Sequence, residues 1–151
     1  MAYLSLVDDN KKIHYAFVIG KARLAPTREV TTPILELSTV LISVKLSKIV
    51  LRELEFKLDK VLYGTDSTSV LKCLNNETKR FHTFESNRIT TICNESSVAQ
   101  LRYVPSDENP ADDSSKGLKL NSMLRNTRWL NGPDFPRKEE KFRPQMIAVP
   151  P

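Results

Sequence analysis

Residues 61–77 read VLYGTDSTSVLKCLNNE, and this stretch decides how the middle of the chain folds. It opens with residues typical of a short strand, and it ends in an amphipathic run typical of a helix. Between the two, the carboxylate of Asp66 stands directly before hydroxyl residues. Serine is a strong N-cap residue, so Ser67 or Ser69 can begin the helix. Asp66 then either caps the helix itself or takes part in chemistry, and in that case its partners come from elsewhere in the chain.

Upstream of this stretch, the sequence predicts a hairpin and a long helix. Residues 2–26, AYLSLVDDNKKIHYAFVIGKARLAP, read as two strands, because DDNKK has the turn chemistry of aspartate and asparagine. Pro33 suits the first turn of a helix, and Thr32 suits its N-cap. From Ile34 to Leu54 the apolar residues are too many for one stripe, so we expect this helix to be buried on more than one side.

Downstream, two helices and a strand are predicted. TKRFHTFESNRITTICNES, residues 78–96, is a helix, and AQLRYVP, residues 99–105, is a last strand. Pro110 fits the first turn of another helix. The order β-β-α-β-α-α-β-α predicts an α/β fold, a mixed sheet with helices packed on it. We expect residues 1–120 to form one domain and residues 121–151, rich in proline and charge, to be a linker or tail with Trp129 as an anchor.

Composition sets broad limits on the class of protein. The chain has 151 residues, of which 40% are hydrophobic and 27% charged, so it can form a core and wholesale disorder is not expected. Its formal charge is +5 and its pI about 9.3. A basic excess of this size permits a polyanion partner but does not demand one.

Cysteines and targeting signals indicate the compartment. Cys73 and Cys93 lie twenty residues apart without CxxC spacing, so we do not expect a zinc site. We expect both cysteines to be reduced thiols. The start of the chain lacks a basic n-region, so no signal peptide is predicted. The most apolar segment, residues 34–51, is interrupted by charges and predicts a core helix instead of a membrane span. We therefore expect an intracellular protein that is not secreted.

Three carboxylates stand at similar structural corners of the predicted fold. Glu36 lies in the first turn of the long helix, Asp66 at the end of the middle strand, and Asp112 at the start of the last helix. Strand ends and helix starts meet at one edge of an α/β sheet, so these acids can converge there. Carboxylates repel each other, and a cluster of them is stabilised by bound cations. Oxygen ligands suit Mg²⁺ or Mn²⁺, and two such ions can cleave a phosphodiester.

Each acid also has a purely structural interpretation. A carboxylate in the first turn of a helix is favoured by the helix dipole, which suffices to explain Glu36. Asp66 and Asp112 can each act as an N-cap. On physical grounds alone, both interpretations remain open.

Four stretches carry a resemblance to a known family. From about Ala2 to Phe135, the chain resembles the ribonuclease H region of Pao/BEL-type LTR retrotransposon polyproteins, which lies between reverse transcriptase and integrase. The resemblance implies a ribonuclease H-like fold, a mixed sheet of five strands with helices on both faces. The stretches are TPILELSTVLISVKLSKIV (32–50), LYGTDSTSVLKCLNNETKRFHTFESNRITTI (62–92), LRYVPSDENPADDSSKGL (101–118) and RWLNGPDF (128–135).

The resemblance assigns roles to the three acids. Glu36 stands where the family's helix glutamate contacts the metals, Asp66 stands in the TDS motif, and Asp112 stands in the NPAD motif. It implies that all three are catalytic ligands of Mg²⁺ or Mn²⁺ in a two-ion site. Asp66 would then be a metal ligand, and Ser67 or Ser69 would cap the helix.

The sequence also departs from the family's pattern. The family's first catalytic aspartate lies on a strand upstream of AYLSLV, where this chain begins, and Asp8 and Asp9 are expected to be plain turn residues. The family usually has arginine at Ile34 and tryptophan at Gly64, and the histidine found near Asp112 in many ribonucleases H is absent. We therefore expect an N-terminally truncated copy, with its first strand missing and a weak, incomplete ion site, inactive by itself.

Three functions follow from this resemblance. The first is an RNA–DNA hybrid endonuclease domain of a polyprotein, adjoining reverse transcriptase and integrase portions, in the cytoplasm or in virus-like particles. The second is a non-catalytic nucleic-acid-binding remnant, and the third a host-captured protein-interaction module. Hybrid duplexes are read through phosphates and the 2′-OH, so sequence specificity is not expected. The candidate phosphate contacts are Lys79, Arg80, Arg88, Arg102, Lys116 and Arg128.

Overall fold

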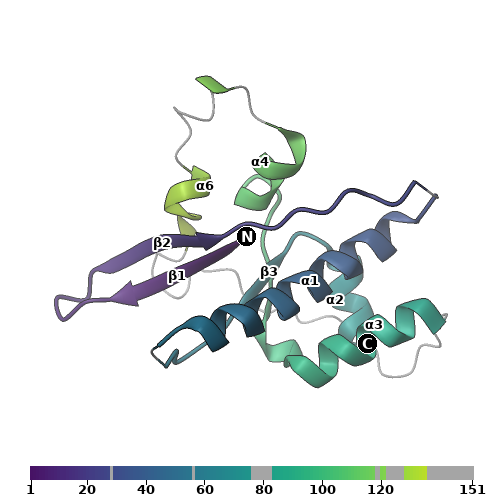
Figure 1. The fold of residues 1–151 in the computed structure, drawn as a ribbon, viewed down its shortest axis with the longest axis horizontal. Coiled ribbons are helices and arrows are strands. Elements are labelled where there is room, and N and C mark those ends of the chain that lie inside the picture. Colours follow the sequence, from purple (N-terminus) through teal and green to yellow (C-terminus); the bar gives the residue numbers. More distant parts are fainter. Residues whose placement is uncertain (28, 56, 76–82, 118–119, 122–127, 136–151) are drawn as a thin grey trace. The chain divides into compact units, whose positions relative to one another are not determined.

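The computed structural model describes residues 1–27, 29–55, 57–75, 83–117, 120–121 and 128–135. The chain divides into two compact units, each described by itself (Figure 1). Unit 1 contains Met1–Leu24 and the described residues from Val104 onward, and unit 2 contains Ala25–Tyr103. The predicted order of strands and helices is confirmed as far as the helix that begins at Pro110. The last strand begins at Leu101 and not at Ala99, because residues 98–100 form a 3₁₀ turn, and a further short helix lies in the predicted tail.

Unit 1 is built on the predicted hairpin. β1 (Ala2–Val7) pairs antiparallel with β2 (Ile13–Ile19). Asp8 closes the turn, because its carboxylate accepts from the Lys12 backbone N–H at 2.8 Å and lies 2.9 Å from His14 Nε2. These two hydrogen bonds, that of His14 first, lower the pKa of the Asp8 carboxyl. Asp8 is thus a turn residue, as predicted.

Two short helices complete unit 1. α4 (Pro110–Lys116) has Asn109 as its N-cap, whose side chain accepts from the Ala111 N–H at 3.1 Å, and proline stands in the first turn as predicted. α6 (Arg128–Asn131) contacts β2. The domain boundary at residue 120 stays a prediction.

Trp129 anchors α6 to the hairpin, as predicted. Its ring meets Phe17 edge to face at 5.4 Å between centroids. Its backbone carbonyl accepts from the Tyr3 hydroxyl at 2.7 Å. Gly132 follows with φ +76°, and a Cβ there would lie 3.2 Å from the rings of Tyr3 and Tyr15. Both the backbone conformation and the close approach therefore require glycine.

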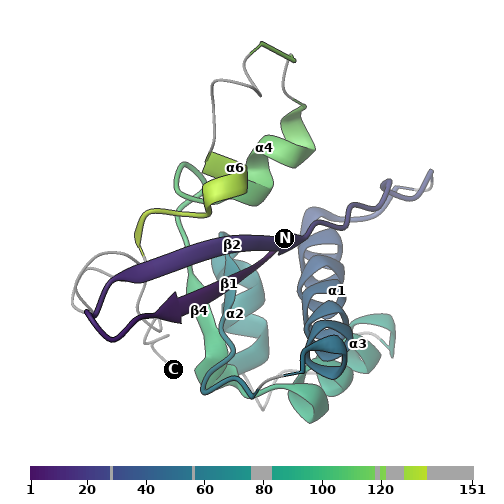
Figure 2. The same cartoon turned by 60° about the vertical axis from the view of Figure 1, so that its left-hand side comes forward.

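Unit 2 is organised around the long helix α1 (Thr32–Glu53). α1 packs against α2 (Thr68–Asn75) and α3 (Thr83–Glu95), and Figures 1 and 2 show the three helices side by side. β3 (Tyr63–Thr65) and β4 (Leu101–Tyr103) pair in parallel, and the 3₁₀ turn η1 (Val98–Gln100) leads into β4. The buried core consists of Leu37, Val40, Val44, Tyr63, Val70, Leu71, Leu74, Ile92 and Leu101.

The start of α1 differs from the prediction by one residue. Its N-cap is Thr31 and not Thr32, because the N–H groups of Ile34 and Leu35 both bond to the Thr31 carbonyl. Glu36 is therefore the fifth helical residue and lies past the first turn, so the predicted first-turn position was wrong. The expectation of burial on more than one side is confirmed, because Leu46 is buried on the face opposite Leu37.

Of the predicted fold, only the mixed α/β class is confirmed. The described strands form one antiparallel pair in unit 1 and one parallel pair in unit 2, so the chain is a mixed α/β protein. A single five-stranded sheet with helices on both faces stays a prediction. None of the helices among the described residues is long and apolar enough to cross a membrane.

The core of unit 2 yields a test of stability. Ile92 on α3 is fully buried, with 0% of its surface exposed, whereas Ile49 on α1 is 45% exposed. We expect Ile92→Ala to lower the free energy of unfolding by about 2–5 kcal/mol, because it leaves a cavity in the core. Ile49→Ala is the matched control and should change it by less than about 1 kcal/mol. Urea denaturation measures both, and equal losses would contradict the assignment of the core.

Candidate metal-binding carboxylates

Ser67 is the residue that joins α1 to the start of α2. It is 5% exposed, and its hydroxyl oxygen accepts from the Val70 N–H at 3.2 Å. The same hydroxyl donates to Glu36 Oε2 at 2.5 Å. The structure therefore decides between the two predicted caps in favour of Ser67.

Glu36 faces the junction of β3 and α2. It lies one helical turn before Val40 and two before Val44, both of which are buried in the core. Because Val40 and Val44 face the core, Glu36 on the same stripe faces inward too, and it is half-buried. The hydrogen bond from Ser67 compensates for the partial burial of the carboxylate.

Asp66 lies between the strand and the cap. It directly follows β3 and directly precedes Ser67, so the Glu36 carboxylate is bonded to the residue next to Asp66. Thr65 adds rigidity, since its hydroxyl accepts from the Ser67 N–H at 3.2 Å. Glu36 and Asp66 offer only oxygen ligands, which suit Mg²⁺ or Mn²⁺. That the two carboxylates hold an ion together stays a prediction.

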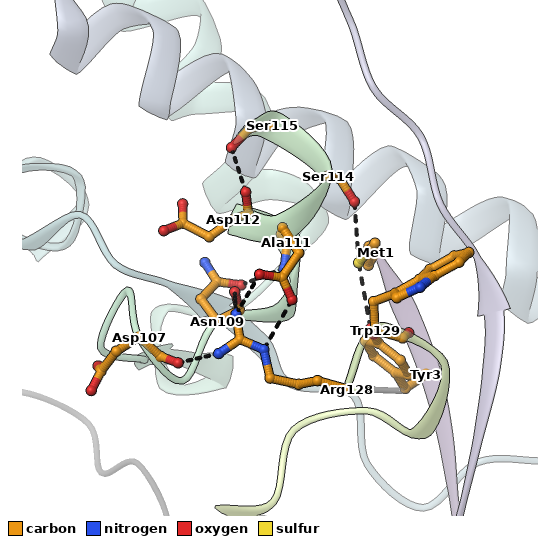
Figure 3. Close-up of polar contacts among 11 residues, drawn as sticks. Met1, Tyr3, Asp107, Asn109, Ala111, Asp112, Ser114, Ser115, Arg128 and Trp129 are labelled. Atoms are coloured by element: carbon orange, nitrogen blue, oxygen red, sulfur yellow. Dashed lines mark hydrogen bonds and ion pairs between the residues drawn. The ribbon is translucent and has the colours of Figure 1, made fainter. Parts of the chain in front are cut away.

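Asp112 belongs to the other unit. It lies in the first turn of α4, and its backbone N–H donates to the Asn109 carbonyl at 3.1 Å. Figure 3 shows its carboxylate pointing away from the Arg128 guanidinium. Among the described residues, no group of three or more His, Cys, Asp or Glu side chains is placed to hold a metal ion. The convergence of Asp112 with the two acids of unit 2 stays a prediction.

Four of the six predicted phosphate contacts are described residues. Lys79 and Arg80 lie outside the described residues, and Lys116 is the last residue of α4. Arg88 donates to the Ser38 hydroxyl at 3.0 Å and stacks 3.4 Å above the Phe84 ring centroid. The remaining two, Arg102 and Arg128, also bond within the chain, and whether any of the six contacts nucleic acid stays a prediction.

Arg102 and Arg128 both donate to the backbone. Arg102 donates to the carbonyls of Ala99 and Leu101 at 2.6 and 2.7 Å. Arg128 forms an ion pair with Asp113, at 2.9 Å between Nη2 and Oδ1. Sequence reasoning missed this pair, because its partners are 15 residues apart and no helical or strand spacing connects them.

Comparison with known proteins found a similarity that covers the first 67 residues. Residues 1–67 match the family model described as the Pao retrotransposon-like RNaseH-like domain. The match confirms the resemblance to the Pao ribonuclease H region; it includes Glu36, Asp66 and Ser67 and ends before Asp112. No curated protein and no solved structure matches the chain.

The double role of Ser67 can be tested against the other predicted cap. Ser67→Ala removes both the N-cap and the donor to Glu36, so we expect the free energy of unfolding to fall by about 2 kcal/mol. Ser69→Ala is the matched control at an exposed position of the same helix, and it should change stability by less than about 0.5 kcal/mol. Thermal and urea unfolding measure both variants. A larger loss for Ser69→Ala would show that the cap is misassigned.

Proposed function

We propose that this chain is a ribonuclease H-like domain of a retroelement polyprotein, directed at the RNA strand of RNA–DNA hybrids. In this proposal Glu36, Asp66 and Asp112 hold Mg²⁺ or Mn²⁺. The observation that carries the proposal is the hydrogen bond from the Ser67 hydroxyl to the Glu36 carboxylate. Ser67 directly follows Asp66, so this bond ties Glu36 to the neighbour of Asp66. The family match over residues 1–67 supports it, because these residues include two of the three acids.

The residues of unit 2 have separate roles in the proposed chemistry. Ser67 orients one oxygen of Glu36, and the Thr65 hydroxyl fixes the backbone from which Asp66 projects. The bound ions would activate a water and stabilise the leaving oxygen of the phosphodiester. Because Ser67 is both cap and donor, its hydroxyl holds the Glu36 carboxylate in one orientation before any ion binds.

The partners and the compartment follow from the same proposal. A hybrid duplex would be recognised through its backbone phosphates and 2′-OH groups, without sequence readout. Reverse transcriptase and integrase portions of the same polyprotein would be its neighbours, and the cytoplasm or a virus-like particle would be its location.

A second function is favoured by the arginines. The three arginines among the described candidates, Arg88, Arg102 and Arg128, donate to groups of the chain itself. Side chains held in this way favour a non-catalytic module that binds a protein, or nucleic acid weakly. Competition separates this function from the first: an RNA–DNA hybrid should displace a labelled hybrid better than duplex DNA does if the chain recognises hybrids.

Metal binding tests the proposed site directly. A cation relieves repulsion among carboxylates, so millimolar Mn²⁺ should raise the thermal midpoint. At about ten times the dissociation constant the gain is about 1.4 kcal/mol, or a few degrees. Asp66→Asn should abolish the rise. Asp59→Asn, an exposed acid of the same unit, is the charge-matched control and should keep it. If Asp66→Asn responds to Mn²⁺ as the parent does, the site is not at Asp66.

Cleavage is the second test. The resemblance implies a further aspartate on a strand that precedes residue 2. We therefore expect Mn²⁺-dependent cutting of a labelled hybrid from a longer version that carries such a strand, and no measurable cutting from the 151 residues alone. Displacement of a reactant by about 1 Å can lower the reaction rate on the order of 100-fold. Loss of a ligand that bridges both ions should lower it further. Cutting by the 151 residues alone that is lost in Asp66→Asn would show that another acid completes the site.

A further inference from the structure

Arg128 holds the segment that leads into α4. Its Nε and Nη2 donate to the two carboxylate oxygens of Asp113 at 3.0 and 2.9 Å. Nη2 also donates to the Asn109 carbonyl at 3.3 Å, and Nη1 donates to the Asp107 carbonyl. Figure 3 shows this single guanidinium against the turn that contains Asp107 and against the start of α4.

These contacts leave Arg128 in a supporting position inside unit 1. The side chains of Arg128 and Asp113 are 29% and 15% exposed, so the pair is shielded better than an ordinary surface pair. Bidentate pairing between a guanidinium and a carboxylate fixes orientation as well as distance. All three guanidinium nitrogens of Arg128 donate within the chain, so the guanidinium group is directed at the protein.

The residues that Arg128 holds stand on both sides of Asp112. Asp113 follows Asp112 in the sequence. Asn109 precedes it, caps α4 through Ala111, and accepts the Asp112 backbone N–H at 3.1 Å. The Asn109 carbonyl thus receives bonds from both Arg128 and Asp112. The backbone of Asp112 is fixed from both directions.

The hairpin fixes Arg128 in turn. The next residue, Trp129, packs on Phe17 and accepts from the Tyr3 hydroxyl. Burial, together with the Asp113 carboxylate, raises the pKa of Tyr3 to about 12, against an opposing effect of Arg128. Tyr3 therefore remains a protonated donor at neutral pH, and its contact reaches from β1 to α6.

We propose that Arg128 is a positioning residue, which sets the direction of the Asp112 carboxylate by holding Asp113 and the carbonyl of Asn109. The inference rests on the proposed function, because it gives Asp112 an ion to bind. It replaces the phosphate contact expected for Arg128 from sequence with an indirect role. Residues that orient metal ligands in this way typically change metal affinity about 10–100-fold when they are replaced.

The test compares Arg128→Gln, Arg128→Lys and Asp113→Asn with the parent. Three quantities are measured: Mn²⁺ affinity by calorimetric titration, exchange of the Asp112 amide hydrogen by NMR, and hybrid binding in EDTA. We expect Arg128→Gln and Asp113→Asn each to weaken Mn²⁺ binding about tenfold and to speed exchange at Asp112. Hybrid binding in EDTA should stay unchanged. The double variant should lose little more than either single one, because both remove the same contact.

Arg128→Lys separates geometry from charge. Lysine keeps the positive charge but lacks the planar fork, so it should behave like Arg128→Gln if orientation matters. Restoration of Mn²⁺ affinity by lysine would overturn the inference, because charge and not orientation would then suffice. Weaker hybrid binding in EDTA with unchanged exchange at Asp112 would overturn it in favour of a phosphate contact.

The remaining outcomes separate this inference from the proposed function. A parent that binds no Mn²⁺ refutes the proposed site and the positioning role together. A parent that binds Mn²⁺ while the folded variants bind it equally well refutes the positioning role alone. If Arg128→Gln does not fold, Asp113→Asn decides, because it keeps the guanidinium and its bonds to the two carbonyls.

Discussion

The packing of α1 is the constraint on which unit 2 depends. Val40 and Val44 lie on one stripe of this helix and are buried in the core, where α1 packs against α2 and α3. Glu36 lies on the same stripe, so core packing also carries a carboxylate toward the end of β3. A partly buried carboxylate is unfavourable without a donor, and the Ser67 hydroxyl supplies one at 2.5 Å. Stability and the proposed metal chemistry therefore use the same contact.

Both units support an acid through a neighbouring residue. In unit 2, Ser67 follows Asp66 and bonds to Glu36 while it caps α2. In unit 1, Asp113 follows Asp112 and binds the Arg128 guanidinium. In each case the supporting residue takes a local hydrogen bond or ion pair, and the adjacent aspartate stands on a backbone that is already fixed. Rigid support of this kind would reduce the reorganisation that the proposed ion binding requires.

Local features of the fold could be predicted from sequence, and features that join distant segments could not. The hairpin turn at Asp8 followed from short-range turn chemistry, and it is confirmed. The choice between Ser67 and Ser69 stayed open, because either can cap a helix, and the contact with Glu36 spans 31 residues. The Arg128–Asp113 pair has no periodic signal at all. The three candidate acids were predicted from motifs, and whether they converge depends on tertiary structure that motifs do not encode.

The departures at Ile34 and Gly64 from the pattern of the family that the chain resembles affect residues outside the core cluster. Gly64 is exposed in β3, between Tyr63 and Thr65, which are both buried because alternate residues of a strand face opposite sides. The core contact on this strand is made by Tyr63, whose hydroxyl lies 2.7 Å from the Ser47 hydroxyl. Ile34 is only half-buried at the start of α1. Substitutions at these two positions leave the packing of α1 and the bond between Ser67 and Glu36 in place. The fold depends on the apolar stripe, whereas the proposed catalysis depends on the carboxylates, so a substitution can affect one without the other.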